Sequence, residues 1–134
     1  MPARMKNKKS IYLIVMISLF VAFLHLIIGP GYQGICRHFI RGYLIDILLP
    51  MNLYLLLQIS FRKRLSVYRS RISAAVLTFS FGVMVELLQF YGIYFFGSTY
   101  DLLDILMYAT GVGSGIVFDL VIINRLEKKG GETE

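Results

Sequence analysis

Long apolar runs separated by short polar segments dominate the chain. Four runs reach the roughly 17–25 residues that a helix needs to cross a bilayer: residues 11–29, 43–61, 72–91 and 102–123. The connections between these runs are short, and no internal repeat or long linker interrupts them. This pattern predicts an all-α protein with a single membrane domain over residues 1–134, an integral membrane four-helix bundle.

Within each run, polar and small residues recur at helical spacing. Positions i, i+3, i+4 and i+7 share one face of a helix. From the first predicted span to the fourth, these faces are Ser18, Ala22, His25 and Gly29; Asp46, Pro50, Tyr54 and Gln58; Thr78, Gly82, Glu86 and Gln89; and Asp101, Asp104, Tyr108 and Gly111. Because polar groups are costly in lipid, we expect these faces to point into the bundle and the large apolar side chains to meet lipid.

The composition and the placement of charge support a membrane protein. The chain is 57% hydrophobic and 16% charged, against about 25% charged residues in a typical soluble domain. Of its 14 Lys and Arg residues, only Arg37 and Arg41 lie between the first and second spans, and none lies between the third and fourth. The positive-inside rule then predicts cytoplasmic termini and outward-facing loops at residues 30–42 and 92–101. The net charge of +6 therefore indicates topology, and we expect no nucleic-acid partner.

Both ends of the chain have a simple interpretation. Basic residues precede the first span, as in a signal peptide, but its apolar stretch is longer than a typical signal core and no small-residue cleavage site follows. We therefore expect a retained membrane anchor. Residues 127–134 are expected to form a frayed, solvated end.

Five acidic residues lie in or beside the predicted spans: Asp46, Glu86, Asp101, Asp104 and Asp119. An acid at a helix centre costs about 2.5–3.5 kcal/mol on insertion scales, so each needs a partner or a function. With the predicted orientation, the first four fall in the outer half of the bundle. Asp119 falls near the cytoplasmic end, where we expect it to pair with Lys or Arg and assign it no further role.

The outer polar residues are expected to form an acidic, outward-facing pocket that binds an amphiphile. The candidate ligand-binding residues are Glu86, Gln89, Asp101, Asp104, Tyr108, Asp46, His25, Arg37 and Arg41. Two interpretations of Arg37 and Arg41 stay open: they reach lipid phosphates or balance the acids, or they hold an anionic headgroup. Asp101 is also placed to serve only as a helix cap. Gly111 and Gly115 form a G-x-x-x-G pair, which favours close helix packing.

Part of this pattern resembles the VanZ-like family of small bacterial membrane proteins. Its signature is E-x-x-Q, a short outer loop and then D-x-x-D-x-x-x-N-x-x-G, and this chain has ELLQ at 86–89, DLLD at 101–104 and Gly111 at the matching positions. Tyr108 stands where the family usually has Asn, as in a closely related family, and residues 97–99 lack its usual Arg. The resemblance runs from about residue 43 to 119. It implies the bacterial cytoplasmic membrane, a cell-envelope role and a link to glycopeptide antibiotic resistance, and it supplies no catalytic mechanism.

Several function classes remain open at this point. The first is a binding protein for membrane lipids or a lipid-linked envelope precursor, without a cofactor and compatible with a homo-oligomer. The second is an enzyme that uses a metal or acid/base chemistry on lipid-linked substrates, although Cys36 is the only cysteine and neither H-x-x-x-H nor C-x-x-C occurs. The third is a proton-coupled transporter, against which the clustering of acids at the outer end argues. A purely structural hydrogen-bond network of the acids with Tyr54, Tyr108, Gln58 and Gln89 is the remaining alternative.

Overall fold

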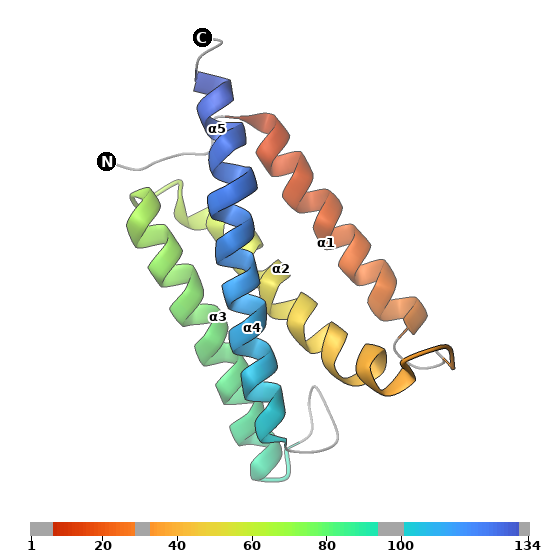
Figure 1. The fold of residues 1–134 in the computed structure, drawn as a ribbon. Coiled ribbons are helices and arrows are strands. Elements are labelled where there is room, and N and C mark those ends of the chain that lie inside the picture. Colours follow the sequence, from red (N-terminus) through yellow and green to blue (C-terminus); the bar gives the residue numbers. More distant parts are fainter. Residues whose placement is uncertain (1–6, 29–32, 94–100, 132–134) are drawn as a thin grey trace.

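The computed structural model describes residues 7–28, 33–93 and 101–131, and regular structure in these ranges is helical throughout (Figure 1). In chain order the elements are α1 (Lys8–Ile28), the short π-helix η1 (Phe39–Leu44), α2 (Ile45–Phe61), α3 (Val67–Phe90), α4 (Leu102–Phe118), the π-helix η2 (Asp119–Ile123) and α5 (Asn124–Gly131). The predicted all-α class is confirmed. No structure is described for Gly29, which belonged to the predicted face of the first span.

Three of the four predicted spans are long and apolar enough to cross a membrane. These are α1, α3 and the continuous helix that runs from α4 through η2 into α5 (Figure 1). The fourth, α2, has 17 residues, but η1 extends it without a break toward its N-terminal side. Within the described residues the number of long spans is therefore one fewer than predicted, because the regular α-helix of the second span begins only at Ile45.

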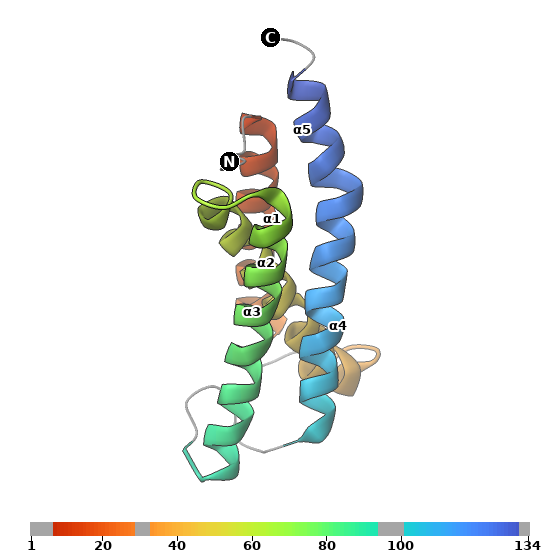
Figure 2. The same ribbon diagram turned by 90° about the vertical axis from the view of Figure 1, so that its left-hand side faces the viewer.

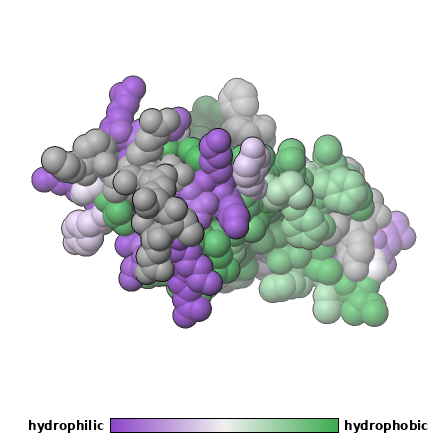
Figure 3. All heavy atoms as spheres, turned by 90° about the horizontal axis from the view of Figure 1, so that it is seen from above, coloured by the Kyte–Doolittle hydropathy of each residue, from purple (hydrophilic) through white to green (hydrophobic). Residues whose placement is uncertain are grey.

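The helices run up and down, and α2 lies at the centre, where it packs against α1, α3 and α4. Figures 1 and 2 show that α1 begins, α2 ends, α3 begins and α5 ends at the same end of the molecule. We call this the terminal end. Seen from this end, hydrophilic side chains gather near the viewer and hydrophobic ones cover the flank that recedes behind them (Figure 3).

The flanks of the bundle are strongly apolar. On α1 the side chains of Tyr12, Met16, Leu19, Phe20, Phe23 and Leu26 are between 59% and 75% exposed. A continuous apolar surface of this kind is typical of contact with lipid rather than with water. The exposed surface and the three long helices together indicate a membrane protein.

Glycines allow α4 to approach α2 closely. A Cβ atom at Gly111 would collide with the backbone oxygen of Ile47, and one at Gly115 would lie 2.7 Å from Cδ1 of Tyr54. A Cβ atom at Gly113, on another side of the same helix, would meet nothing within 4 Å. The G-x-x-x-G pair therefore serves contact between helices of this chain, as the sequence predicted.

The predicted inward face of the third span is confirmed, and that of the first is wrong in part. The face of the second is buried from Pro50 to Gln58 but only partly at Asp46. On the fourth only Gly111 is buried, and the other three residues are partly exposed. On α3 all four predicted residues are buried, from Thr78 to Gln89. On α1 Ala22 and His25 are exposed, whereas Ser10, Ile14 and Val21 are buried. Ser18 does face inward, and its hydroxyl donates to Oδ1 of Asn52 at 2.6 Å. Most of α1 is apolar, so its few small and polar residues do not determine which side meets the bundle.

Helix α3 begins earlier than predicted and ends in a defined cap. The Ser66 hydroxyl accepts a hydrogen bond from the backbone N–H of Arg69, so the helix includes residues assigned to the preceding loop. At the other end, Gly92 has a φ of 82°. Its N–H donates to Gln89 and that of Ile93 donates to Leu88, which is a Schellman motif.

The prediction of a frayed end at residues 127–134 is wrong for the part up to 131. These residues belong to α5, because α4 continues through η2 instead of ending. Asn7 ties the start of α1 to this helix: its side-chain amide donates to the Leu126 carbonyl at 2.7 Å, and its backbone N–H donates to Oε2 of Glu127 at 3.3 Å. Residues 132–134 lie outside the described residues.

Candidate functional site

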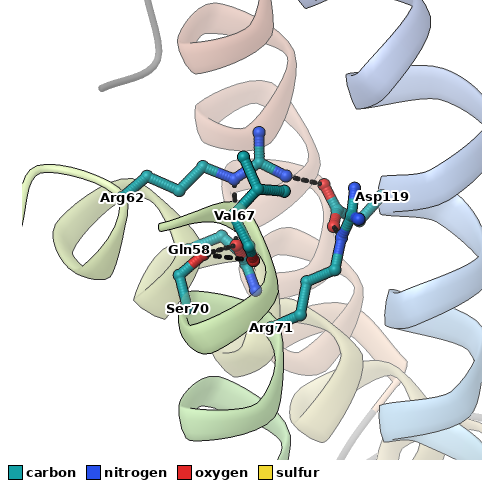
Figure 4. Close-up of polar contacts among 6 residues, drawn as sticks. All are labelled: Gln58, Arg62, Val67, Ser70, Arg71 and Asp119. Atoms are coloured by element: carbon teal, nitrogen blue, oxygen red, sulfur yellow. Dashed lines mark hydrogen bonds and ion pairs between the residues drawn. The ribbon is translucent and has the colours of Figure 1, made fainter. Parts of the chain in front are cut away.

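Two polar clusters lie inside the bundle, one toward each end. The arginine cluster, near the terminal end, consists of Gln58, Arg62, Ser70, Arg71 and Asp119 (Figure 4). Asp119 is fully buried and accepts from Nη2 of Arg62 at 2.6 Å and from Nε of Arg71 at 2.5 Å. Oε1 of Gln58 accepts from Nε of Arg62 at 3.1 Å and from the Ser70 hydroxyl at 3.2 Å. The expected pairing of Asp119 with basic residues is confirmed.

This cluster holds three helical segments together. Arg62 follows α2, Arg71 lies in α3, and Asp119 begins η2. A carboxylate engaged by two guanidinium groups has the charge compensation that burial demands. Arg62 and Arg71 are thus used inside the protein, whereas Lys63 and Arg64 in the same basic stretch are exposed.

The acidic cluster lies toward the opposite end and consists of Asp46, Glu86, Asp101, Asp104 and Tyr108. Glu86 is 1% exposed. Its Oε1 accepts from the Tyr108 hydroxyl at 3.2 Å, and its Oε2 accepts from the Asp101 backbone N–H at 3.4 Å. The carboxyl groups of Asp46 and Asp104 lie close enough to Glu86 and to each other for their charges to interact. The structure therefore brings together five of the nine predicted site residues.

Local helix chemistry positions these side chains. Asp101 has extended backbone angles, and its Oδ1 accepts from the Leu103 N–H at 2.9 Å, so it is the N-cap of α4. This cap marks where α4 begins, and Tyr108 of the same helix reaches Glu86 of α3. Gly82, one helical turn before Glu86, leaves room for the Tyr108 ring: a Cβ atom there would lie 2.7 Å from Cδ2 of that ring. The Asp101 side chain therefore serves as a cap, while its backbone N–H contacts Glu86.

A cavity of about 550 Å³ adjoins the acidic cluster. Helices α1, α2, α3 and α4 all contribute to its lining, which consists of His25, Asp46, Leu49, Pro50, Leu53, Thr78, Phe81, Gly82, Val85 and Tyr108. Most of the lining is apolar, with polar groups from four of these residues. Its volume lies in the range of roughly 300–1,000 Å³ that is usual for small-molecule sites.

The remaining predicted site residues are less closely connected. His25 reaches the cavity lining from an exposed position on α1. Gln89 is buried, but it is absent from the lining and its Oε1 has no hydrogen-bond partner among the described residues. Arg37 is exposed, and no ion pair joins it to an acid in the part of the chain that the structure describes. The side chain of Arg41 lies outside the described part.

Thr78 and the apolar wall residues were not among the predicted site residues. Thr78 is 2% exposed, it lines the cavity, and its hydroxyl has no hydrogen-bond partner within the described residues. Thr78 lies eight residues before Glu86 on the buried face of α3, and this helical spacing could have identified it as a site residue. The apolar wall residues carry no such signal, because any Leu, Phe or Val of a membrane helix has the same pattern.

Comparisons of the chain with protein-family models, with curated proteins and with solved structures find no match. Over residues 7–28, 33–93 and 101–131, no group of three or more His, Cys, Asp and Glu side chains is arranged to hold a metal ion. What can be inferred about function therefore comes from the cavity and the two polar clusters.

Proposed function

We propose that this chain is a small VanZ-like membrane protein that binds an amphiphile or a lipid-linked headgroup in its cavity. The observation that carries the proposal is the cavity itself, with its apolar walls and its polar groups gathered from four helices. Such a lining suits a ligand with a hydrocarbon part and a polar head. Placing the Asp46 carboxyl group of this lining inside a membrane costs free energy, which a bound ligand would offset.

The walls of the cavity are reachable from the membrane. Leu49 and Phe81 line it and are each 42% exposed on the flank of the bundle. The cavity therefore has lipid-facing residues on its rim as well as buried residues such as Val85. An amphiphile already in the bilayer could enter sideways without first leaving the lipid.

We further propose that both termini lie in the cytoplasm, so that the acidic cluster is near the outer surface of a bacterial cytoplasmic membrane. The up-and-down arrangement supports this, because it collects the basic residues at the start of α1, after α2 and in α5 at the terminal end (Figures 1 and 3). In the sequence of the connections between α1 and α2 and between α3 and α4, the Lys and Arg residues are Arg37 and Arg41. This asymmetry follows the positive-inside rule.

The natural Cys36 offers a direct test of orientation. It is exposed on the connection between α1 and α2, at the end opposite the termini. A membrane-impermeant maleimide should label it on intact cells. The matched control is Cys36→Ser combined with Lys63→Cys, which should react only after permeabilisation. The reverse pattern would contradict the proposed orientation.

Ligand binding is tested by filling the cavity without altering its polar groups. Val85→Phe places a larger side chain in the wall, whereas Val76→Phe makes the same change at a 60% exposed position of the same helix, outside the lining. Native mass spectrometry should show a co-purifying amphiphile with the natural protein and with Val76→Phe, and its loss with Val85→Phe. Equal occupancy in all three proteins would contradict the proposal.

The two alternative functions receive less support. An enzyme that depends on a metal would need a ligand set, and the described residues offer none with three or more protein ligands. A proton-coupled transporter would need titratable groups across the bundle. The acid toward the terminal end, Asp119, is engaged by two arginines instead of standing free.

A further inference from the structure

The two ends of the bundle treat buried acids differently. Asp119 is matched by two guanidinium groups within 2.6 Å. Asp46, Glu86 and Asp104 interact with one another, yet among the described residues no Lys or Arg forms an ion pair with any of them. Asp119 thus has two basic partners, whereas the carboxyl groups beside the cavity have none among the described residues.

The hydrogen-bonding groups in the cavity lining are mostly ready to accept. Asp46 offers carboxylate oxygens. The Tyr108 hydroxyl has committed its proton to Glu86, so its oxygen can accept from a ligand. The Thr78 hydroxyl is buried, lies in the lining and has no hydrogen-bond partner among described residues, so Thr78 is the third residue whose oxygen can accept. A primary ammonium group carries three donors and no acceptor, and so complements the oxygens of these three residues.

We infer that the ligand of this cavity is an amphiphile whose head is a primary ammonium group, held by Asp46, Thr78 and Tyr108, with its hydrocarbon part along Leu53 and Val85. The inference rests on the proposed function and deepens it by naming the headgroup. The cation would supply the compensation that the acids lack, and charge-assisted hydrogen bonds are about twice as strong as neutral ones. His25, on the rim, is the other titratable side chain in the lining.

Three probes with the same tail isolate the head: dodecylamine, dodecanol and dodecanoate. Their affinities for the full chain are measured by native mass spectrometry in a neutral detergent at pH 7. We expect dodecylamine to bind about tenfold or more tighter than dodecanol, because a hydrogen bond to a charged group contributes roughly 1.5–3 kcal/mol. Dodecanoate should bind most weakly. Equal affinities, or a preference for dodecanoate, would overturn the inference.

Variants separate a role in charge recognition from a structural one. Asp46→Asn should reduce dodecylamine affinity to that of dodecanol and leave dodecanol binding unchanged. Glu127→Gln removes the same formal charge near the terminal end and should preserve the preference for the amine. If Asp46→Asn does not fold, as judged by circular dichroism, Thr78→Val provides the second test and should weaken dodecylamine more than dodecanol. An unchanged preference in the variant used would overturn the inference.

The cavity-filling variant Val85→Phe distinguishes failure of the ammonium inference from failure of the proposed function. One outcome is that Val85→Phe binds none of the three probes, while the natural protein binds all three with equal affinity. This result would support the cavity as the binding site and reject the preference for an ammonium head. Retention of all three probes in Val85→Phe would reject the cavity as the site, and the ammonium inference with it.

Discussion

The contact between α2 and α4 predicts opposite effects for the same substitution at two neighbouring glycines. Gly→Ala within a helix stabilises by about 0.4–1 kcal/mol when nothing obstructs the new methyl group. Gly113 has open space at this position, so Gly113→Ala should stabilise the protein by about that amount. At Gly111 the methyl group would meet the Ile47 carbonyl oxygen and lie 3.1 Å from Cβ of Pro50. Overpacking of this kind costs about 1–3 kcal/mol, and a backbone oxygen cannot rotate away.

We therefore expect Gly111→Ala to lower the free energy of unfolding by about 1–2 kcal/mol, and Gly113→Ala to raise it. The assay is unfolding of the purified protein in mixed micelles with increasing sodium dodecyl sulfate, followed by circular dichroism. Both variants change the same residue type in the same helix, so differences in helix propensity cancel in the comparison. Equal free energies for the two variants would refute the close approach of α4 to α2.

Two further predictions concern the polar clusters. Asp119→Asn should lower the free energy of unfolding by about 3–5 kcal/mol, because it leaves the buried Arg62 and the partly buried Arg71 without a counter-charge. The triple variant with Arg62→Met, Arg71→Met and Asp119→Leu should unfold at a higher denaturant concentration than the single variant, and an equal or lower midpoint would contradict a buried ion cluster. Tyr108→Phe removes the donor to Glu86 and should lower the free energy of unfolding by about 1–3 kcal/mol. An unchanged midpoint in the same unfolding assay would contradict a stabilising hydrogen bond between these two side chains.

Polar residues at helical spacing were the most informative part of the sequence. On α3 the predicted face from Thr78 to Gln89 is buried as a whole, because an apolar helix in lipid has few polar side chains and each must find the interior. The same reasoning predicted that Asp119 would pair with basic residues. It did not identify Arg62 and Arg71, since the partners depend on how α2 and α3 sit around η2.

Other features depend on three-dimensional packing that the sequence pattern does not encode. On α1 the predicted face was wrong at Ala22 and His25, because nearly every side chain of that helix is apolar and several faces are equally acceptable to lipid. The cavity arises where four helices fail to fill the space between them, which no single-helix pattern predicts. The contacts of α5 with Asn7, from the far end of the chain, likewise join residues that no local pattern connects.

The proposed ligand site is tested most directly by photo-crosslinking with an amphiphile that carries a diazirine in its tail, followed by peptide mapping. Labelling should concentrate on the cavity walls at Leu53 and Val85 in the natural protein. In the cavity-filling variant Val85→Phe, labelling at Leu53 should disappear. Labelling confined to the exposed lipid-facing side chains of α1, such as Phe20 and Phe23, and unchanged by Val85→Phe, would contradict binding in the cavity.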